Sequence, residues 1–421
     1  MNRLPWCSTS ARGQRLLPVC ALLICALWAA GIRSQQPDAS LLAITHGPYL
    51  QLPTSTSVTI VWHTNRPCVS RVEYWTSDSS HSAARAELAR PSTGVMTAVS
   101  SEHGLIDNDR TSHVIRLTGL TAGTTYEYRV VSREFGGYEK QHIVKWSGTV
   151  SGDILSFTTL DEKKASYWFA VVSDIHENAK RLDAVLAPLD WKRTDFVVFD
   201  GDMVNDFMNL DQPFTGFVDV SVARFGRAIP FVYVRGNHDV RGRFARRLTD
   251  YFPTRDGHAY YSFDHGPVHF VVLDSGEDKV DAHEYYNGLV AFEPYRREQA
   301  KWLADDLRIA AARRARYRVV LSHIPPYDGT SRTGTAEEAF AIRQVRECWE
   351  RPANAGGVDL WLSGHTHRYA HLAPAAGRNR YHLVIGAPDT LTRVDVSREK
   401  LTVTLTRETG QTLDVITVRA R

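Results

Sequence analysis

Five short segments carry nearly every Asp, Asn and His residue that a site for two metal ions would need. They are Asp174-Ile175-His176, Gly201-Asp202, Gly236-Asn237-His238-Asp239, Ser322-His323 and Gly364-His365-Thr366-His367. Each follows a run of apolar, β-type residues, so each is expected at the end of a strand. Carboxylate and amide groups supply hard oxygen ligands, His supplies borderline nitrogen, and no Cys competes with them. This mixture suits manganese, ferrous iron or zinc rather than calcium.

Taken alone, each segment is a weak signal. An Asp-x-His occurs by chance in many proteins, and a lone Gly-Asp after a strand is most often a turn. The segments at 236–239 and 364–367 are more specific, because paired imidazoles or an Asn-His pair at a strand end rarely serve packing. The Gly before Asp202, Asn237 and His365 lets the backbone turn sharply and approach a metal or a phosphate. Together the five segments indicate a dinuclear metallohydrolase.

In its order and spacing the series resembles the calcineurin-like metallophosphoesterases, whose pattern is Asp-x-His, Gly-Asp-x-x, Gly-Asn-His-Asp/Glu, His and Gly-His-x-His. The resemblance spans the whole region 165–421. It implies two divalent metal ions (manganese, iron or zinc) that share the bridging carboxylate of Asp202. The implied ligands of one ion are Asp174, His176, Asp202 and His367, and those of the other are Asp202, Asn237, His323 and His365.

The resemblance also implies a reaction. Two cations roughly 3.5–4 Å apart would turn a bridging water into hydroxide and clamp phosphoryl oxygens for in-line attack. His238 would act as general acid or stabilise the leaving-group oxygen, with Asp239 orienting its ring. We therefore expect an exported phosphoesterase whose substrate is a small phosphomonoester. A phosphodiesterase acting on cyclic nucleotides or phospholipid headgroups is the alternative, because the loops at 205–225 and 275–295 would decide between them. A non-catalytic binding protein on the same scaffold is a third hypothesis.

The region 42–160 has the short alternating strands of an all-β sandwich. Its stretch from Leu117 to Tyr126 resembles the corner of fibronectin type III domains at which a Tyr stacks and hydrogen-bonds. Together with Gly-Pro-Tyr-Leu-Gln at 47–51, the sandwich resembles the N-terminal domain of purple acid phosphatases. Those enzymes have Asp-x-Gly and a Tyr that binds ferric iron, whereas this chain has His176 and Asn205 at these places. We therefore expect two divalent ions, with Asn205 or Asp206 near the metals but not ligating them.

After a polar linker at 161–164, the pattern changes to strand followed by helix. The fold class expected for 165–421 is α/β, with two mixed sheets flanked by helices in four layers (αββα). In such sheets the carboxyl ends of the strands form the crevice that binds ligands. A single helical pattern covers Glu293 to Arg314, and the tail strands Tyr381 to Ile385 and Leu401 to Leu405 are expected to close a second sheet. Asp274 is expected in a turn or behind the site, and Tyr327 in a loop shaped by prolines.

Residues 1–34 have the layout of a signal peptide, with Arg3, Arg12 and Arg15 ahead of an apolar run. A secreted or periplasmic protein is therefore expected. An N-terminal membrane anchor is the alternative, although the run falls short of the ~20 apolar residues that span a bilayer. Removing the leader takes four Arg residues from a net charge of +3, giving 3 − 4 = −1. Such a near-neutral surface argues against a nucleic-acid partner, and the oligomeric state is not indicated. Only Cys68 and Cys348 would survive processing, so a disulfide is unsupported.

Overall fold

The computed structural model describes residues 41–77, 94–141, 143–329 and 336–420. The expected signal peptide at 1–34 lies outside these ranges. Within them, no helix combines the length and the apolar character that crossing a membrane requires.

The N-terminal region contains only strands, as its alternating pattern predicts. Its strands are β1 (Ile44–Gln51), β2 (Val58–Thr76), β3 (Met96–Val99), β4 (Ser101–Glu102), β5 (Leu105–Ile106), β6 (Arg110–Leu117), β7 (Thr125–Glu139), β8 (Ile143–Ser151) and β9 (Leu155–Thr158). The long strand β2 pairs with β1, β3, β6 and β7, and β7 also pairs with β8 and β9. Trp62, Tyr128 and Phe157 are buried in the core between them. The all-β expectation is confirmed.

The turn after β6 has the contact predicted for its Tyr. The backbone N–H of Thr121 donates a hydrogen bond to the Tyr126 hydroxyl at 3.0 Å. The Tyr126 ring stacks on Phe157 of β9, with ring centroids 5.7 Å apart. This residue therefore fixes the corner that leads into β7.

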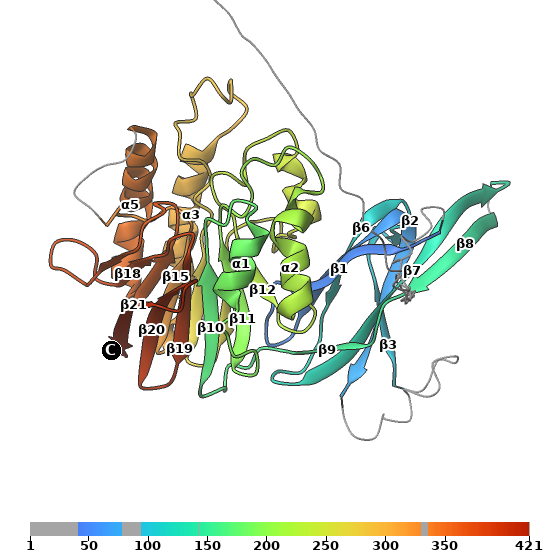
Figure 1. The fold of residues 1–421 in the computed structure, drawn as a ribbon, viewed down its shortest axis with the longest axis horizontal. Coiled ribbons are helices and arrows are strands. Elements are labelled where there is room, and N and C mark those ends of the chain that lie inside the picture. The colour runs from blue at the N-terminus through green and yellow to red at the C-terminus, as the bar shows by residue number, and fades with distance from the viewer. Residues whose placement is uncertain (1–40, 78–93, 142, 330–335, 421) are drawn as a thin grey trace, which may run out of the picture. The chain divides into compact units, whose positions relative to one another are not determined.

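Two sheets form the second region, and each combines parallel and antiparallel strand pairs (Figure 1). The first has the order β21 (Thr412–Arg419), β20 (Lys400–Arg407), β19 (Thr390–Val396), β10 (Tyr167–Val172), β11 (Thr194–Asp200) and β12 (Phe231–Val234). The second has the order β13 (Tyr261–His265), β14 (Val268–Val272), β15 (Tyr317–Leu321), β16 (Leu360–Ser363), β18 (His382–Ile385) and β17 (Ala370–Leu372). Phe169, Phe196 and Phe270 belong to the core that joins the two sheets.

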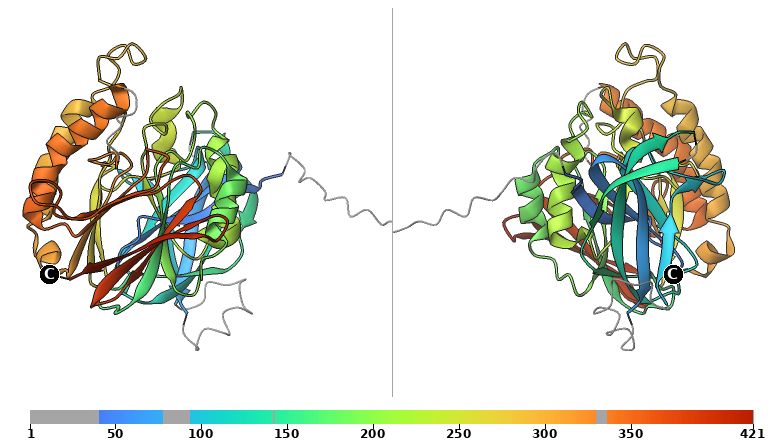
Figure 2. Two further views of the ribbon diagram at one scale, coloured as in Figure 1. Left: turned by 60° about the vertical axis from the view of Figure 1, so that its left-hand side comes forward. Right: turned by 90° about the vertical axis from the view of Figure 1, so that its right-hand side faces the viewer.

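Helices cover the outer face of each sheet, so that the layers run helix, sheet, sheet, helix (Figure 2, left). On the first sheet lie α1 (Ala179–Leu186), the π-helical turns η3 (Phe214–Val218) and η4 (Val222–Gly226), and α2 (Asp219–Ser221) between them. On the second lie α3 (Phe292–Asp306), α4 (Ala310–Arg314) and α5 (Ala336–Gly356). A short 3-10 helix, η5 (Ala245–Asp250), follows β12. The predicted αββα arrangement is confirmed.

Three details of the sequence interpretation were wrong. The two tail segments do not share a sheet, because Leu401 to Leu405 lies in β20, which turns back on β19 through a tight turn and stays beside it in the first sheet. Only the segment ending at Ile385 joins the second sheet. The expected helix 293–314 is two helices, α3 and α4. Much of the expected loop 205–225 is helical, because its apolar side chains, such as Phe217, pack on the first sheet.

The sandwich packs against the first sheet of the second region. Gln51 of β1 pairs with Phe231 of β12 in parallel, so the ladder of hydrogen bonds runs from one region into the other. The Tyr49 hydroxyl donates to the Tyr251 carbonyl at 2.9 Å, and the Tyr128 hydroxyl donates to the Arg227 carbonyl at 2.8 Å. These contacts lie on the first sheet and its helices.

Candidate metal centre

The candidate ligands follow the carboxyl ends of strands in both sheets. Asp174 and His176 follow β10, Asp202 follows β11, and Asn237 follows β12 in the first sheet. In the second sheet, His323 follows β15, whereas His365 and His367 follow β16. Because the strand ends of the two packed sheets meet at one edge of the molecule, residues nearly two hundred positions apart become neighbours.

These side chains form two groups that could each hold a cation. One ligand atom from each of Asp174, His176, Asp202 and His367 lies within 4.8 Å of the others, and the same holds for Asp202, His323 and His365. Asp202 is common to both groups. The amide oxygen of Asn237 lies 2.9 Å from Nδ1 of His365, which places it beside the second group. The structure thus brings all seven predicted ligands together, and their role as ligands stays a prediction.

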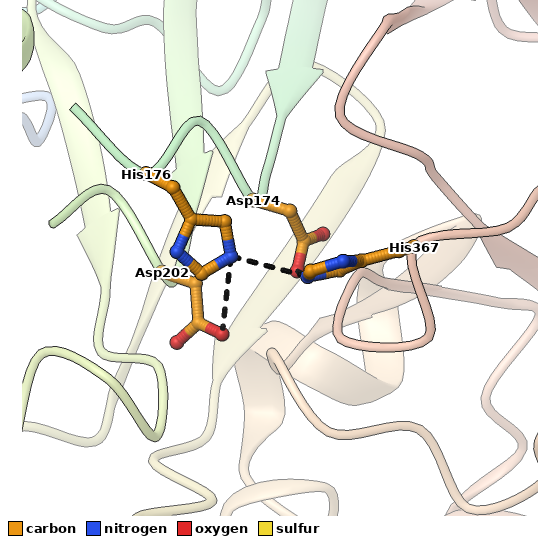
Figure 3. A group of neighbouring side chains, drawn as sticks. All are labelled: Asp174, His176, Asp202 and His367. Atoms are coloured by element: carbon orange, nitrogen blue, oxygen red, sulfur yellow. Dashed lines mark hydrogen bonds and ion pairs between the residues drawn. The ribbon is translucent and has the colours of Figure 1, made fainter. Parts of the chain in front are cut away.

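Within the first group the donor atoms face one another (Figure 3). Nε2 of His176 lies 3.1 Å from Nε2 of His367, which is itself 3.3 Å from Oδ1 of Asp174. In the second group, Nε2 of His323 lies 3.0 Å from Oδ2 of Asp202. Carboxylate oxygens and imidazole nitrogens that converge in this way are the usual surroundings of a bound divalent ion.

The backbone at the ligands is strained. Positive φ angles occur at Asp174 (56°), His176 (48°), Asp202 (52°), His365 (73°) and His367 (54°). They make up five of the eleven non-glycine residues with positive φ in the described ranges. Each such residue costs about 1–3 kcal/mol, and this strain persists where the surrounding structure enforces it, typically at functional sites. The sequence offered only a faint signal for this feature, since Asp and His tolerate such angles better than most residues.

Glycines next to the ligands leave room for them, as the sequence predicted. A Cβ atom on Gly236 would lie 2.3 Å from the backbone nitrogen and Oδ1 of Asp202. One on Gly364 would lie 2.5 Å from Oδ2 of Asp174, and one on Gly201 would lie 2.5 Å from the His323 ring. Any side chain at these positions would displace a candidate ligand.

The buried carboxylate of Asp202 is stabilised in its charged form by neighbouring positive charge. Burial alone would raise the pKa of Asp202, yet the adjacent His323 ring lowers it far below its usual range. Conversely, burial alone would lower the pKa of His323, but Asp202 raises it to about 10. Asp200 lies on the same strand end, and burial raises its pKa to about 8. A buried carboxylate that holds a protonated imidazole beside it occupies a place where a cation is stabilised.

His238 lies beside the first group with its ring partly exposed. Its Nδ1 donates to the Asn205 carbonyl at 2.5 Å, and the ring meets the His176 ring edge-on, with centroids 4.8 Å apart. With Nδ1 engaged, Nε2 is the atom that remains for a substrate, and Nη1 of Arg241 lies 3.2 Å from it. The Asn205 side chain lies against the His176 carbonyl. Asn205 therefore orients His238 and does not face the ligands.

Asp239 does not orient the His238 ring, so that expectation was wrong. Its buried carboxylate instead accepts hydrogen bonds from four backbone N–H groups, those of Asp202, Met203, Val204 and Gly236, at 2.8–3.3 Å. Burial and the charge of Asp202 raise its pKa to about 6. Asp239 therefore fixes the backbone on both sides of Asp202, which is a positioning role.

Comparison with known proteins agrees with this geometry. Residues 167–369 match the family described as calcineurin-like phosphoesterase, and residues 46–159 match the purple acid phosphatase N-terminal domain. Residues 167–369 of the chain therefore form a calcineurin-like phosphoesterase domain.

Relatives of this chain include named phosphatases. The serine/threonine-protein phosphatase CPPED1 of Pongo abelii is 29% identical over 147 residues, which are 34% of this chain and 43% of that protein. Purple acid phosphatase 22 of Arabidopsis thaliana is 26% identical over 271 residues, which are 61% of this chain and 52% of that protein. The chain thus spans about half the length of these relatives.

Among solved structures, the purple acid phosphatase PPD1 from seeds of yellow lupin (Lupinus luteus) has the same fold. It superposes with a TM-score of 0.65 at 13% identity, covering 88% of this chain and 74% of the lupin chain.

The candidate metal centre borders a network of charged side chains that the sequence interpretation missed. Arg241 donates two hydrogen bonds to Glu277, from Nε at 2.9 Å and from Nη2 at 2.6 Å, and a third to Asp278 at 2.8 Å. Asp278 in turn lies 3.4 Å from the amide nitrogen of Asn237. Arg241 follows the Gly-Asn-His-Asp segment by two positions, which was the only signal available. Its partners lie 36 and 37 residues further along the chain, in a loop that has no motif.

Asp274 and Tyr327 lie outside the site. Asp274 is fully buried and forms an ion pair with Arg235, so it has the structural role that was expected. The Tyr327 hydroxyl donates to Glu350 at 2.5 Å, which holds the proline-containing loop against α5.

Proposed function

We propose that this chain is an exported, metal-dependent phosphoesterase that hydrolyses phosphomonoesters at the candidate metal centre. The observation that carries the proposal is the pair of ligand groups that share Asp202. Both sheets contribute to each group. Export rests on the expected signal peptide at 1–34. N-terminal sequencing of the protein recovered outside the cell tests it, and a protein that keeps Met1 would contradict it.

The residues present suit two divalent ions. The donor set contains carboxylate, amide and imidazole groups, which manganese, ferrous iron and zinc accept. The glycine positions described above leave a cradle that any Cβ atom would fill. Because Asn205 stands where ferric sites of related enzymes have Tyr, and its carbonyl is held by His238, a ferric ion has no phenolate ligand here. Two divalent ions bound there would lower the pKa of a water molecule and neutralise the oxygens of a phosphoryl group.

His238 is the residue we assign to the leaving group. Its Nδ1 is held by the Asn205 carbonyl, so the ring is fixed with Nε2 toward the exposed side of the site. In the structure Nε2 accepts from Nη1 of Arg241. When the ring gains a second proton, on Nε2, that proton can pass to the departing oxygen of the substrate, which is general acid catalysis. Nη1 of Arg241 lies close enough to stabilise negative charge on the same oxygen. Asp239 supports both by fixing the backbone around Asp202.

The test compares a monoester with a diester. The protein, loaded in turn with manganese, zinc and ferrous iron, is assayed with 4-nitrophenyl phosphate and bis(4-nitrophenyl) phosphate. We expect faster hydrolysis of the monoester. Diester hydrolysis alone would favour the phosphodiesterase alternative, and no hydrolysis of either ester with any of the three metals would contradict the proposal.

Two variants test whether the activity depends on the candidate metal centre. Asp202→Asn removes the carboxylate common to both ligand groups and should abolish activity while the circular dichroism spectrum stays native. Asp219→Asn is the matched control, because Asp219 is exposed and pairs with His46 away from the site. If the purified Asp202→Asn protein kept full activity, the hydrolysis would come from a different site or from a contaminant.

A further inference from the structure

An open pocket of about 830 Å³ lies next to His238. Segments 206–208, 235–246 and 279–292 contribute to its wall. Two of its lining residues reach His238, since Nη1 of Arg241 lies 3.2 Å from Nε2 and Oδ1 of Asp206 lies 4.0 Å from Nδ1. The pocket therefore begins on the side of the site from which the leaving group of a phosphoester would depart.

Exposed apolar side chains gather around this pocket. Met208, Tyr285 and Leu289 line it, and Tyr285 and Leu289 are each 71% exposed. Leu210 and Val280, also exposed, lie close to lining residues in the chain. Single exposed apolar residues are common on protein surfaces, but several around one concave site point to an apolar ligand.

The positive charges of the pocket are already paired. The pairs are Arg235 with Asp274, Arg241 with Glu277 and Asp278, Lys279 with Asp278, and Arg246 with the Leu289 carbonyl. Carboxylates thus compensate three of these four cations within the protein, and the fourth, Arg246, donates to a neutral carbonyl. A second phosphate or a carboxylate on the ligand would have to compete with them. The pocket thus favours a neutral, apolar group.

At the rim, Tyr285 presents an aromatic ring. The Lys279 ammonium lies 5.6 Å from the centre of this ring and restrains it on one side. The His283 ring also meets it at a steep angle, with centroids 4.7 Å apart. A ring that is restrained by two neighbours and still largely exposed can pack against an apolar ligand at a small cost in conformational entropy.

We propose that this pocket binds the alcohol portion of the substrate, so that the enzyme prefers phosphomonoesters of bulky aromatic alcohols. The inference rests on the proposed function and adds the substrate class to it. Tyr285 and Leu289 are the residues that determine this preference. His238 and Arg241 act on the ester oxygen at the inner end of the pocket.

The experiment measures kcat/KM for 2-naphthyl phosphate and phenyl phosphate, whose alcohols have similar acidity but differ by one ring. The ratio of the two values isolates binding of the larger group. We expect the wild-type protein to favour the naphthyl ester. The double variant Tyr285→Ser/Leu289→Ser should lose about tenfold of that ratio through a higher KM, with kcat for phenyl phosphate retained.

A matched double variant provides the control. Tyr138→Ser/Leu105→Ser removes a Tyr that is 62% exposed and a Leu that is 77% exposed, both on the sandwich. It should leave the ratio unchanged. A wild-type ratio near one, or an equal ratio in the pocket variant and the wild type, would overturn the inference while the phosphoesterase function stands. Absence of hydrolysis of either ester in the metal-loaded wild type would instead refute the proposed function.

Discussion

Replacing Gly236 with Ala probes the metal centre without removing any ligand. The added Cβ would lie 2.3 Å from the backbone nitrogen and Oδ1 of Asp202. Real Cβ atoms essentially never come closer than 3.0 Å to such neighbours, so Asp202 or the Gly236 backbone must move by about 0.7 Å. The φ angle of Gly236 is not positive, unlike that of Gly201, so this variant adds a steric clash without added backbone strain.

The size of this movement decides the expected effect. Coordination distances in metal sites hold to within about 0.2 Å, so a shift of about 0.7 Å exceeds the tolerance severalfold. Because Asp202 is common to both ligand groups, both ions would lose a well-placed ligand. Disturbing the support of ligands typically costs 10–100-fold in metal affinity or activity. We expect a loss of about 100-fold in kcat/KM, with a loss of stability of about 1–3 kcal/mol from overpacking.

The assay combines metal titration with kinetics. Isothermal titration with manganese gives the affinity and the number of ions bound, and hydrolysis of 4-nitrophenyl phosphate gives the activity. Gly148→Ala is the control, because Gly148 also lacks a positive φ and its Cβ would meet no atom closer than 3.7 Å. Wild-type affinity and activity in Gly236→Ala would refute the reasoning, since the close approach of the glycine would then be irrelevant to the site.

Three further predictions follow from the same structure. Asp239→Asn should lower manganese affinity about 10–100-fold in titration calorimetry, because the carboxylate holds the backbone around Asp202; unchanged affinity would remove its positioning role. Chelation with EDTA should lower the melting temperature in scanning calorimetry, since an ion at 100 times its Kd stabilises the folded state by about 2.7 kcal/mol, and an unchanged melting temperature would contradict metal binding. Burial alone would lower the pKa of His269, but Asp264 and Asp306 raise it to about 9. Its stabilisation, about 3 kcal/mol, is therefore fully present below pH 6.5 and lost as the pH rises through 9; urea unfolding should show this loss in the wild type and not in His269→Gln.

Much of the site was predictable because its chemistry lies in short, contiguous motifs. Asp-x-His, Gly-Asn-His-Asp and Gly-His-x-His each put polar residues directly after an apolar strand. Because parallel strands run in the same direction, their carboxyl ends lie at the same edge of the sheet. The division of ligands into two groups sharing Asp202 came from the family resemblance. The structure brings the same Asp and His side chains together in two such groups, and their role as ligands stays a prediction.

The residues that were missed or misassigned depend on contacts between loops. Asp239 follows His238 in sequence, which made an interaction between them plausible, but its carboxylate points to the backbone amides of 202–204. Arg241 acquires its role only through Glu277 and Asp278, whose loop has no periodicity or motif. Such pairings are set by tertiary packing, and a single sequence carries no record of them.

The misplaced tail strand has a similar origin. Apolar alternation predicts that Leu401 to Leu405 is a strand, and β20 confirms that. The sheet that β20 joins is decided by the strand before it. That strand, β19, pairs in antiparallel register with the edge of β10, with Tyr167 opposite Val396, so β20 also lies in the first sheet. Periodicity reports that one face is buried but not which partner buries it.

The metal centre and the core between the sheets depend on each other. In the first ligand group, only His367 comes from the second sheet, whereas in the second group Asp202 comes from the first sheet and His323 and His365 from the second. Neither group can close unless the two sheets pack in one relative position, and Phe169 and Phe270 help to set that position by an edge-to-face contact with centroids 5.2 Å apart. Free energy gained when cations bind to both groups must therefore also oppose separation of the sheets. The strained backbone at the ligands is tolerated for the same reason, because packing from both sides holds it.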